Sequence, residues 1–324
     1  MFGVLLAIFA DDAQAVTMNW SAVGNAVNAN DPATGNLYGG VGYNYNIGTY
    51  DVTNNQYIEF LNAKDPTAAN TLGLWNTNMG KVSLGGIRIF DFNPPGSKYG
   101  LISGDRGDYP VNYETWYDAV RFANWMNNGQ GNGSTETGAY TLLGGTATPS
   151  NGASITRNAG ATIFLPSESE WYKAAYNNPG GSTYNLYPTS SSLVPTASAP
   201  TGLANHVNYN NAVGNFTDVG AYTGTTSPYG AFDMGGNISQ WNEALAFGSG
   251  GLARVIRGGA FVDTNATALQ SSNRNVNNRP TNENGGIGFR VANIPGGFVV
   301  PEPSTGMLAV IACGMLWWWR KRFK

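Results

Sequence analysis

The stretch Phe164-Leu165-Pro166-Ser167-Glu168-Ser169-Glu170-Trp171 joins a short apolar run to a capped helix. Proline ends the apolar run, and Ser167 with Glu170 three residues later forms a capping box, which predicts a helix from this point. The helix is expected to end at Asn177-Asn178-Pro179-Gly180, which is a strong turn signal. Glu168 and Glu170 diverge at a spacing of two, so they are not a general acid and base pair, and Glu170 serves the cap.

Two further helices are predicted upstream of this stretch. Thr53 and Gln56 form another capping box, and three apolar side chains then fall on one helix face: Tyr57, Phe60 and Leu61. Asn112 is the expected N-cap of a helix over residues 113–126. The apolar residues of that helix recur at spacings of three and four, which predicts a buried face: Trp116, Ala119, Val120, Ala123 and Met126.

Short apolar pieces separated by Gly and Asn predict short strands near the start and in the last third of the chain. They are Met18-Asn19-Trp20, Val41-Gly42-Tyr43, Ala231-Phe232, residues 253–256, residues 260–262 and residues 288–292. Residues 177–204 are rich in Ser, Thr, Pro and Gly and are expected to form a long surface loop. The pattern indicates an α+β domain with little regular structure.

Composition excludes several classes of function. Lys and Arg number 17 against 20 Asp and Glu, and the folded part has no basic cluster, so nucleic acid is not an expected partner. The one cysteine, Cys313, lies in an apolar run near the end, which leaves no thiol for a zinc site or a nucleophile in the folded part. The one histidine, His206, cannot supply a site that needs two or three imidazoles, and its polar surroundings predict a solvent-facing loop residue.

The start of the chain has features of a signal peptide over residues 1–15. Residues 1–10 are apolar, and Ala13-Gln14-Ala15 has the small-x-small pattern of a signal-peptidase site. The usual positive n-region is missing, so an ordinary apolar N-terminus is the alternative. The folded domain is then expected over residues 16–295.

The end of the chain, residues 296–324, has three parts: a motif at 300–303 containing Pro301, Glu302 and Pro303, an apolar segment at 304–319, and a basic end at 320–324. Fourteen apolar residues rise only about 21 Å as a helix, against about 30 Å of hydrocarbon core, so snorkelling basic ends are needed to span it. This order resembles the PEP-CTERM sorting signal; the alternative is a plain tail anchor. The resemblance implies processing by an exosortase-type protease and delivery, after transient anchoring in the inner membrane, to the outer envelope or extracellular matrix of a Gram-negative bacterium that makes exopolysaccharide.

Six short blocks stand in order along the chain: residues 50–57, residues 109–125, residues 164–171, Asp233-Met234-Gly235-Gly236-Asn237-Ile238-Ser239-Gln240-Trp241, Arg257-Gly258-Gly259 and Ile287-Gly288-Phe289-Arg290. They resemble the motifs of the formylglycine-generating (sulfatase-modifying factor) family over residues 40–293. The resemblance implies the C-type-lectin-like fold of that family. Most of the blocks also have a structural interpretation: Arg257 and Arg290 as buried partners of carboxylates, the glycines as positive-φ or close-contact positions, and Trp241 as core.

Members of the family that oxidise a substrate cysteine hold copper(I) with two cysteines a few residues beyond the Arg-Gly-Gly block. Soft thiolates stabilise that ion. Here the corresponding stretch, residues 260–268, reads Ala-Phe-Val-Asp-Thr-Asn-Ala-Thr-Ala and contains no cysteine. The resemblance therefore predicts that the copper mechanism is not available to this chain. Relatives that use non-haem iron draw histidines partly from an accompanying helical domain, which is also missing here.

Calcium suits the oxygen-rich composition better than copper does. Carried over from the family, a structural calcium site would use the side chains of Asp233 and Gln240 with the carbonyls of Gly236 and Ile238. Gln240 replaces a glutamate and so contributes no charge. A second family site would begin at Asn208 and Tyr209, and its downstream carboxylate has no clear position.

The sequence thus favours a surface or matrix domain without catalytic activity, with polysaccharide or another surface protein as ligand. The rival hypothesis is an enzyme: a metal-dependent oxidase or a modifier of exported proteins. A third is that residues 127–160 and 177–204 present loops to a partner.

Overall fold

The computed structural model describes residues 15–248 and 250–295. Residues 1–14 of the predicted signal peptide, the sorting motif and the C-terminal membrane segment lie outside the described residues. Within the described ranges, none of the helices is both long enough and apolar enough to span a bilayer.

The described residues contain three α-helices: α1 (Asn54–Lys64), α2 (Trp116–Asn127) and α3 (Glu168–Tyr176). The capping boxes predicted for α1 and α3 are confirmed. The Gln56 backbone N–H donates to the Thr53 hydroxyl over 3.3 Å, and the Thr53 N–H donates to the Gln56 amide oxygen over 3.0 Å. In α3 the Ser167 N–H donates to a Glu170 carboxylate oxygen over 2.6 Å.

The predicted start of α2 is wrong. The helix begins at Trp116, and its N-cap is Thr115, which forms a capping box with Asp118. Tyr113 has φ of 63°, in the left-handed region that a right-handed helix does not use. Asn112 instead donates its amide to the carbonyls of Leu84 and Gly285 over 3.2 Å each.

Two four-stranded sheets are formed by the described residues. The first has the order β1 (Trp20–Val23), β2 (Tyr45–Gly48), β12 (Ala292–Asn293) and β5 (Ile163–Phe164). The second has the order β10 (Asn275–Asn278), β9 (Gly251–Arg257), β8 (Ser239–Gly248) and β11 (Ile287–Phe289), with only β11 and β8 parallel. Two small pairs complete the set: β3 (Ile87–Ile89) with β4 (Tyr99–Leu101), and β6 (Thr196–Ala197) with β7 (His206–Val207).

The strand predictions are partly confirmed. Residues 253–256 lie in β9, and residues 288–292 include parts of β11 and β12. Residues 231–232 and 260–262 are not strands, because the chain turns at both places. Residues 177–204 have little regular structure, as expected, but Tyr187 is buried in a small cluster with Val207 and Leu269, so the segment is not all surface loop.

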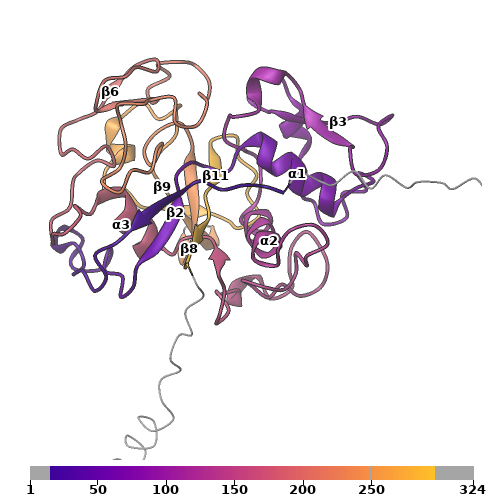
Figure 1. Cartoon of the computed structure of the whole chain (residues 1–324), viewed down its shortest axis with the longest axis horizontal. Coiled ribbons are helices and arrows are strands. Elements are labelled where there is room, and N and C mark those ends of the chain that lie inside the picture. The colour runs from indigo at the N-terminus through magenta and orange to yellow at the C-terminus, as the bar shows by residue number, and fades with distance from the viewer. Residues whose placement is uncertain (1–14, 249, 296–324) are drawn as a thin grey trace, which may run out of the picture.

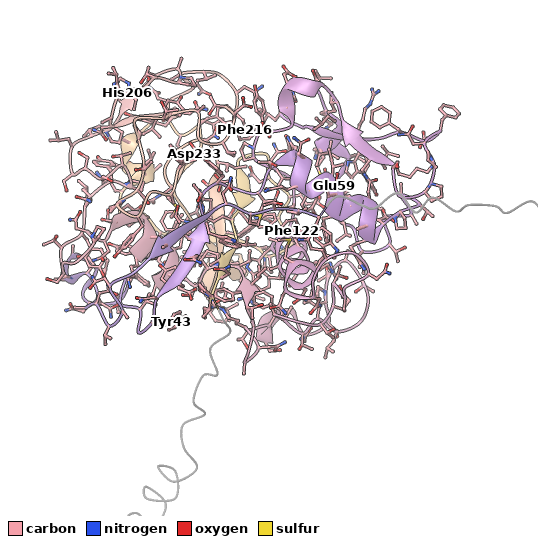
Figure 2. All side chains as sticks on the ribbon, in the orientation of Figure 1. Tyr43, Glu59, Phe122, His206, Phe216 and Asp233 are labelled. Carbon is pink, nitrogen blue, oxygen red and sulfur yellow. The ribbon has the colours of Figure 1, made fainter. Side chains whose placement is uncertain are left out.

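The two sheets and the helices enclose an aromatic core. Figure 1 shows α1, α2 and β3 on one side of β11, with α3, β2 and β6 on the other. Phe122 of α2, labelled near the centre of Figure 2, packs its ring 5.5 Å from that of Phe60 and 5.4 Å from that of Phe289. Trp241 of β8 is fully buried, which confirms it as core.

Candidate functional site

A pocket of about 320 Å³ opens where β8 begins and β9 ends. Arg257 and Gly259 come from the end of β9 and the turn after it, and Ser239 from β8. The other lining side chains are mostly short and polar: Asp263, Thr264, Asn265, Thr267, Asn273 and Asn275. We call this the polar pocket.

The turn that borders the polar pocket depends on glycine. Gly258 and Gly259 have φ of 98° and 71°, which L side chains rarely adopt. A Cβ on Gly258 would also lie 2.9 Å from the Met234 carbonyl oxygen. The carboxylate of Asp263 then closes the turn by accepting the Ala260 N–H over 2.7 Å. The prediction that these glycines hold positive-φ positions is confirmed.

Arg257 also lines the pocket, and its charge is neutralised by Glu168 of α3. Its Nε and Nη2 lie 2.9 and 2.7 Å from one oxygen of Glu168, and its Nη1 donates to the carbonyls of Ser271 and Asn273. Arg274 binds the same carboxylate, with 2.9 Å between its Nη2 and the second oxygen. The predicted carboxylate partner of Arg257 is confirmed, and the pocket presents neutral hydrogen-bonding groups and one carboxylate rather than an unpaired cation.

The polar pocket contains the stretch that carries copper ligands in the resembling family. Residues 263–265, 267 and 268 all line it. Their side chains offer hydroxyl, amide and carboxylate oxygens and no sulfur, and copper(I) requires soft donors. These residues therefore do not fit a copper centre.

Two of the predicted calcium ligands lie side by side in the structure. The Gln240 amide donates to the Asp233 carbonyl over 2.7 Å, and the Asp233 carboxylate accepts the Gly220 N–H over 2.6 Å. Burial raises the pKa of Asp233 to about 6.

The amide oxygen of Gln240 fits a calcium ion poorly. It already accepts from the Trp171 indole over 2.6 Å and from the Arg290 Nε over 2.7 Å. A cation at that oxygen would be repelled by the positive charge of the Arg290 guanidinium. That guanidinium is itself paired with Asp51 at 3.1 Å. Calcium at Asp233, Gly236, Ile238 and Gln240 stays a prediction.

The second predicted calcium position adjoins the first. The Asn208 carbonyl accepts the Asn237 N–H over 2.8 Å, and a Cβ on Gly236 would lie 2.6 Å from the same oxygen. The Asn208 side-chain oxygen is buried and has no hydrogen-bond partner among the described residues. Tyr209 uses its hydroxyl on the Pro195 carbonyl. Across the described ranges, no group of three or more His, Cys, Asp or Glu side chains is placed to hold a metal.

His206 is not the solvent-facing loop residue that the sequence predicts. It lies in β7, is half-buried, and places Nδ1 2.9 Å from the Ser198 hydroxyl. Figure 2 shows it in the same part of the molecule as Asp233, with which it lines a hollow of only about 10 Å³.

A second pocket, of about 230 Å³, was not foreseen from the sequence. We call it the hairpin pocket, and its lining comes from well-separated segments: Trp116, Tyr140, Ala153, Ile155, Thr156, Arg157, Glu243, Leu245 and Arg254. Arg157 bridges the carboxylates of Glu170 and Glu243 at 2.6 and 2.7 Å. The Arg254 guanidinium lies 3.7 Å from the centre of the Trp116 ring. No local sequence pattern unites these residues.

Comparison with known proteins agrees with the resemblance. Residues 40–294 match the family model described as the sulfatase-modifying factor enzyme 1-like domain. No curated protein gives a significant match.

Two solved structures share the fold at low sequence identity. Treponema denticola variable protein 1 is 20% identical, with a TM-score of 0.55 over 87% of this chain and 97% of that one. The crystal structure of CarF is 21% identical, with a TM-score of 0.55 over 86% and 99%. At these identities the likeness concerns the fold alone.

Proposed function

Because the chain belongs to the sulfatase-modifying factor enzyme 1-like domain family, we propose that it uses the family's scaffold as a binding domain and has no formylglycine-generating activity. One observation carries this proposal. Within the stretch 260–268, Asp263, Thr264, Asn265 and Thr267 line the polar pocket with oxygen donors and no sulfur, where copper-dependent members of the family hold the ion with thiolates.

The lining of the polar pocket favours a neutral, hydroxyl-rich ligand. Thr264, Thr267, Asn273 and Asn275 supply donors and acceptors without charge. Arg257 is already paired with Glu168, so the pocket has no free cation to attract a phosphate or carboxylate. A segment of polysaccharide is the ligand class that we propose, with another surface protein as the alternative.

The proposed place of action is the cell envelope. The N-terminal pattern of residues 1–15 and the tail of residues 296–324 support export and exosortase-type sorting, with the apolar segment as a transient membrane helix. A C-type-lectin-like domain at the surface or in the exopolysaccharide matrix would meet polysaccharide there.

A binding measurement tests the polar pocket. Isothermal titration of the chain with purified exopolysaccharide fragments is expected to show binding that Thr264→Val weakens roughly fivefold, because one hydrogen bond is worth about 1 kcal/mol. Thr223→Val is the matched control, since Thr223 is exposed and lies outside the pocket, and it should bind as the parent does.

An oxygen electrode tests the absence of the family's chemistry. The same preparation, supplied with copper and a cysteine-containing peptide, should consume no oxygen above the rate without protein. Peptide-dependent uptake that requires Asp263 would overturn the proposal.

A further inference from the structure

The outer edge of β8 is only partly covered. β11 pairs with Ser239–Trp241, and the Pro166 carbonyl accepts the Glu243 N–H over 3.0 Å. Beyond that point the strand continues to Gly248 with β9 on its other side. Within the described ranges, no hydrogen bond reaches the outer side of β8 past Ala244.

The hairpin register shows which backbone groups face outward. Gly248 and Gly251 are paired with two residues between them in the chain, and residues that flank such a short hairpin connection exchange hydrogen bonds with each other. In an antiparallel pair the bonded positions alternate, which makes Ala246 and Ala253 the next bonded pair. Leu245 and Phe247 therefore direct their N–H and C=O groups away from β9, toward the open side.

The open part of this edge lacks the charges and prolines that usually prevent pairing with another strand, and the register shift of β8 lies before it, between Trp241 and Leu245. Residues 244–248 read Ala-Leu-Ala-Phe-Gly, without a charge or a proline. Leu245 is 41% exposed and Phe247 is 79% exposed, and both lie on one face of the strand. Leu245 also lines the hairpin pocket, so that apolar face continues into a hollow formed with Trp116, Tyr140 and Ile155.

We propose that two copies of the chain pair antiparallel through this edge, about a two-fold axis at Ala246. In that register, Leu245 faces the partner's Phe247, and Phe247 faces the partner's Leu245. Each such pair would exchange both of its outward hydrogen bonds, which gives four bonds across the interface.

The side chains fit this register as well as the backbone does. Paired Cβ atoms lie about 4.5–5.5 Å apart on one face of a sheet, so the partner's Phe247 would pack on Leu245 and cover the hairpin pocket. At the axis, the two Ala246 residues form the closer, non-bonded kind of pair, with Cα atoms about 4.5 Å apart. A small side chain suits that position.

A two-fold axis at Ala246 pairs both open outward positions, Leu245 and Phe247, with open positions of the partner, whereas an axis at Leu245 would pair Phe247 with Glu243, whose N–H already donates to the Pro166 carbonyl. This inference concerns β8 and the hairpin pocket and does not depend on the function proposed for the polar pocket.

The association state of the full chain tests the proposal. Light scattering after size-exclusion chromatography should give a dimer mass, and Phe247→Pro should weaken the dimer at least tenfold by removing the outward N–H and the ring. Proline is tolerated at an edge where the N–H faces outward, so the melting temperature should change little. Phe92→Ala removes a fully exposed phenylalanine outside this edge and should leave the dimer intact.

Disulfide trapping tests the register independently of Phe247. In a Cys313→Ser background, Ala246→Cys should form a cross-linked dimer under mild oxidation, because the Cα separation at the axis suits a disulfide. Ala244→Cys should remain uncross-linked, because in this register Ala244 faces residue 248 of the partner, four residues along the strand from the partner's own cysteine. A chain that stays monomeric at high concentration, or cross-links equally from both positions, overturns the proposal.

Discussion

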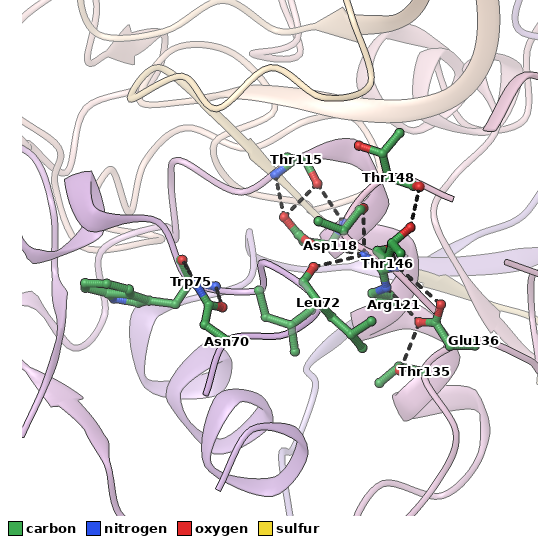
Figure 3. A network of polar contacts seen from close by, with 12 residues as sticks. Asn70, Leu72, Trp75, Thr115, Asp118, Arg121, Thr135, Glu136, Thr146 and Thr148 are labelled. Carbon is green, nitrogen blue, oxygen red and sulfur yellow. Dashed lines mark hydrogen bonds and ion pairs between the residues drawn. The ribbon is translucent and has the colours of Figure 1, made fainter. Parts of the chain in front are cut away.

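At the scale of single residues, one arginine organises the long loop of residues 127–160. Arg121 of α2 is fully buried and binds Glu136 through Nε at 2.7 Å. Its other donors go to the carbonyls of Thr146 and Ala147, over 2.7 and 3.0 Å, as Figure 3 shows for Thr146. A guanidinium has five donors in a fixed fork, so it can join two points of the loop to the helix at once.

Removal of this guanidinium should therefore loosen the loop. We expect Arg121→Leu to lower the free energy of unfolding by about 3 kcal/mol, the lower end for breaking a buried ion pair, since Glu136 is partly exposed. Urea denaturation measures the loss, and limited proteolysis should show new cleavage within residues 127–160. Glu136→Gln keeps an acceptor for Arg121 and should cost clearly less; equal losses for the two variants would contradict this explanation.

At the scale of secondary-structure elements, α2 depends on a cap that sequence reasoning placed three residues too early. Thr115 accepts the Asp118 N–H over 3.1 Å, and the Asp118 carboxylate accepts the Thr115 N–H over 2.9 Å. Thr115→Ala should reduce the free energy of unfolding by about 1 kcal/mol, because a helix N–H loses its partner. Thr115→Ser keeps the hydroxyl and should restore most of that loss in the same thermal melts.

The helices were easier to predict than the strands because a capping box is a local pattern. Thr53 with Gln56 and Ser167 with Glu170 marked α1 and α3 correctly, whereas Asn112 was predicted as the cap of α2 and the capping box of Thr115 with Asp118 was overlooked. The longest strand, β8, was missed because its register shifts between Trp241 and Leu245, which breaks the alternation that identifies a strand.

The two pockets also differ in how far they could be predicted from the sequence. Much of the polar pocket lies in one stretch, residues 257–268, which the family resemblance had already singled out. The hairpin pocket assembles residues from 116 to 254, and no spacing along the chain signals that contact.

At the scale of the whole molecule, several buried carboxyl groups make stability depend on pH. Burial raises the pKa of Asp51 to about 8, that of Asp118 to about 7 and that of Asp233 to about 6. The folded state then binds protons more tightly than the unfolded chain, in which aspartate titrates near 3.9. Stability from these groups is fully present below about pH 4 and is lost as the pH rises through 6 to 8.

Glu170 acts in the opposite direction. Burial by itself would raise the pKa of Glu170, but Arg157 and Tyr43 outweigh it and lower that pKa. Its contribution is present above the unfolded value of about 4.3 and is lost as the pH falls below that value.

The melting temperature should therefore be highest near pH 4 and fall steadily toward pH 8. Differential scanning calorimetry across pH 4–8 measures this profile. Asp51→Asn should flatten the decline between pH 5 and 8, because an amide at this fully buried position stays neutral as the protonated carboxyl does. Asp105→Asn, at an exposed carboxylate, should leave the slope unchanged. A profile that rises from pH 5 to pH 8 would show that the Arg290 guanidinium keeps Asp51 ionised throughout, and that the pair stabilises the fold as a salt bridge.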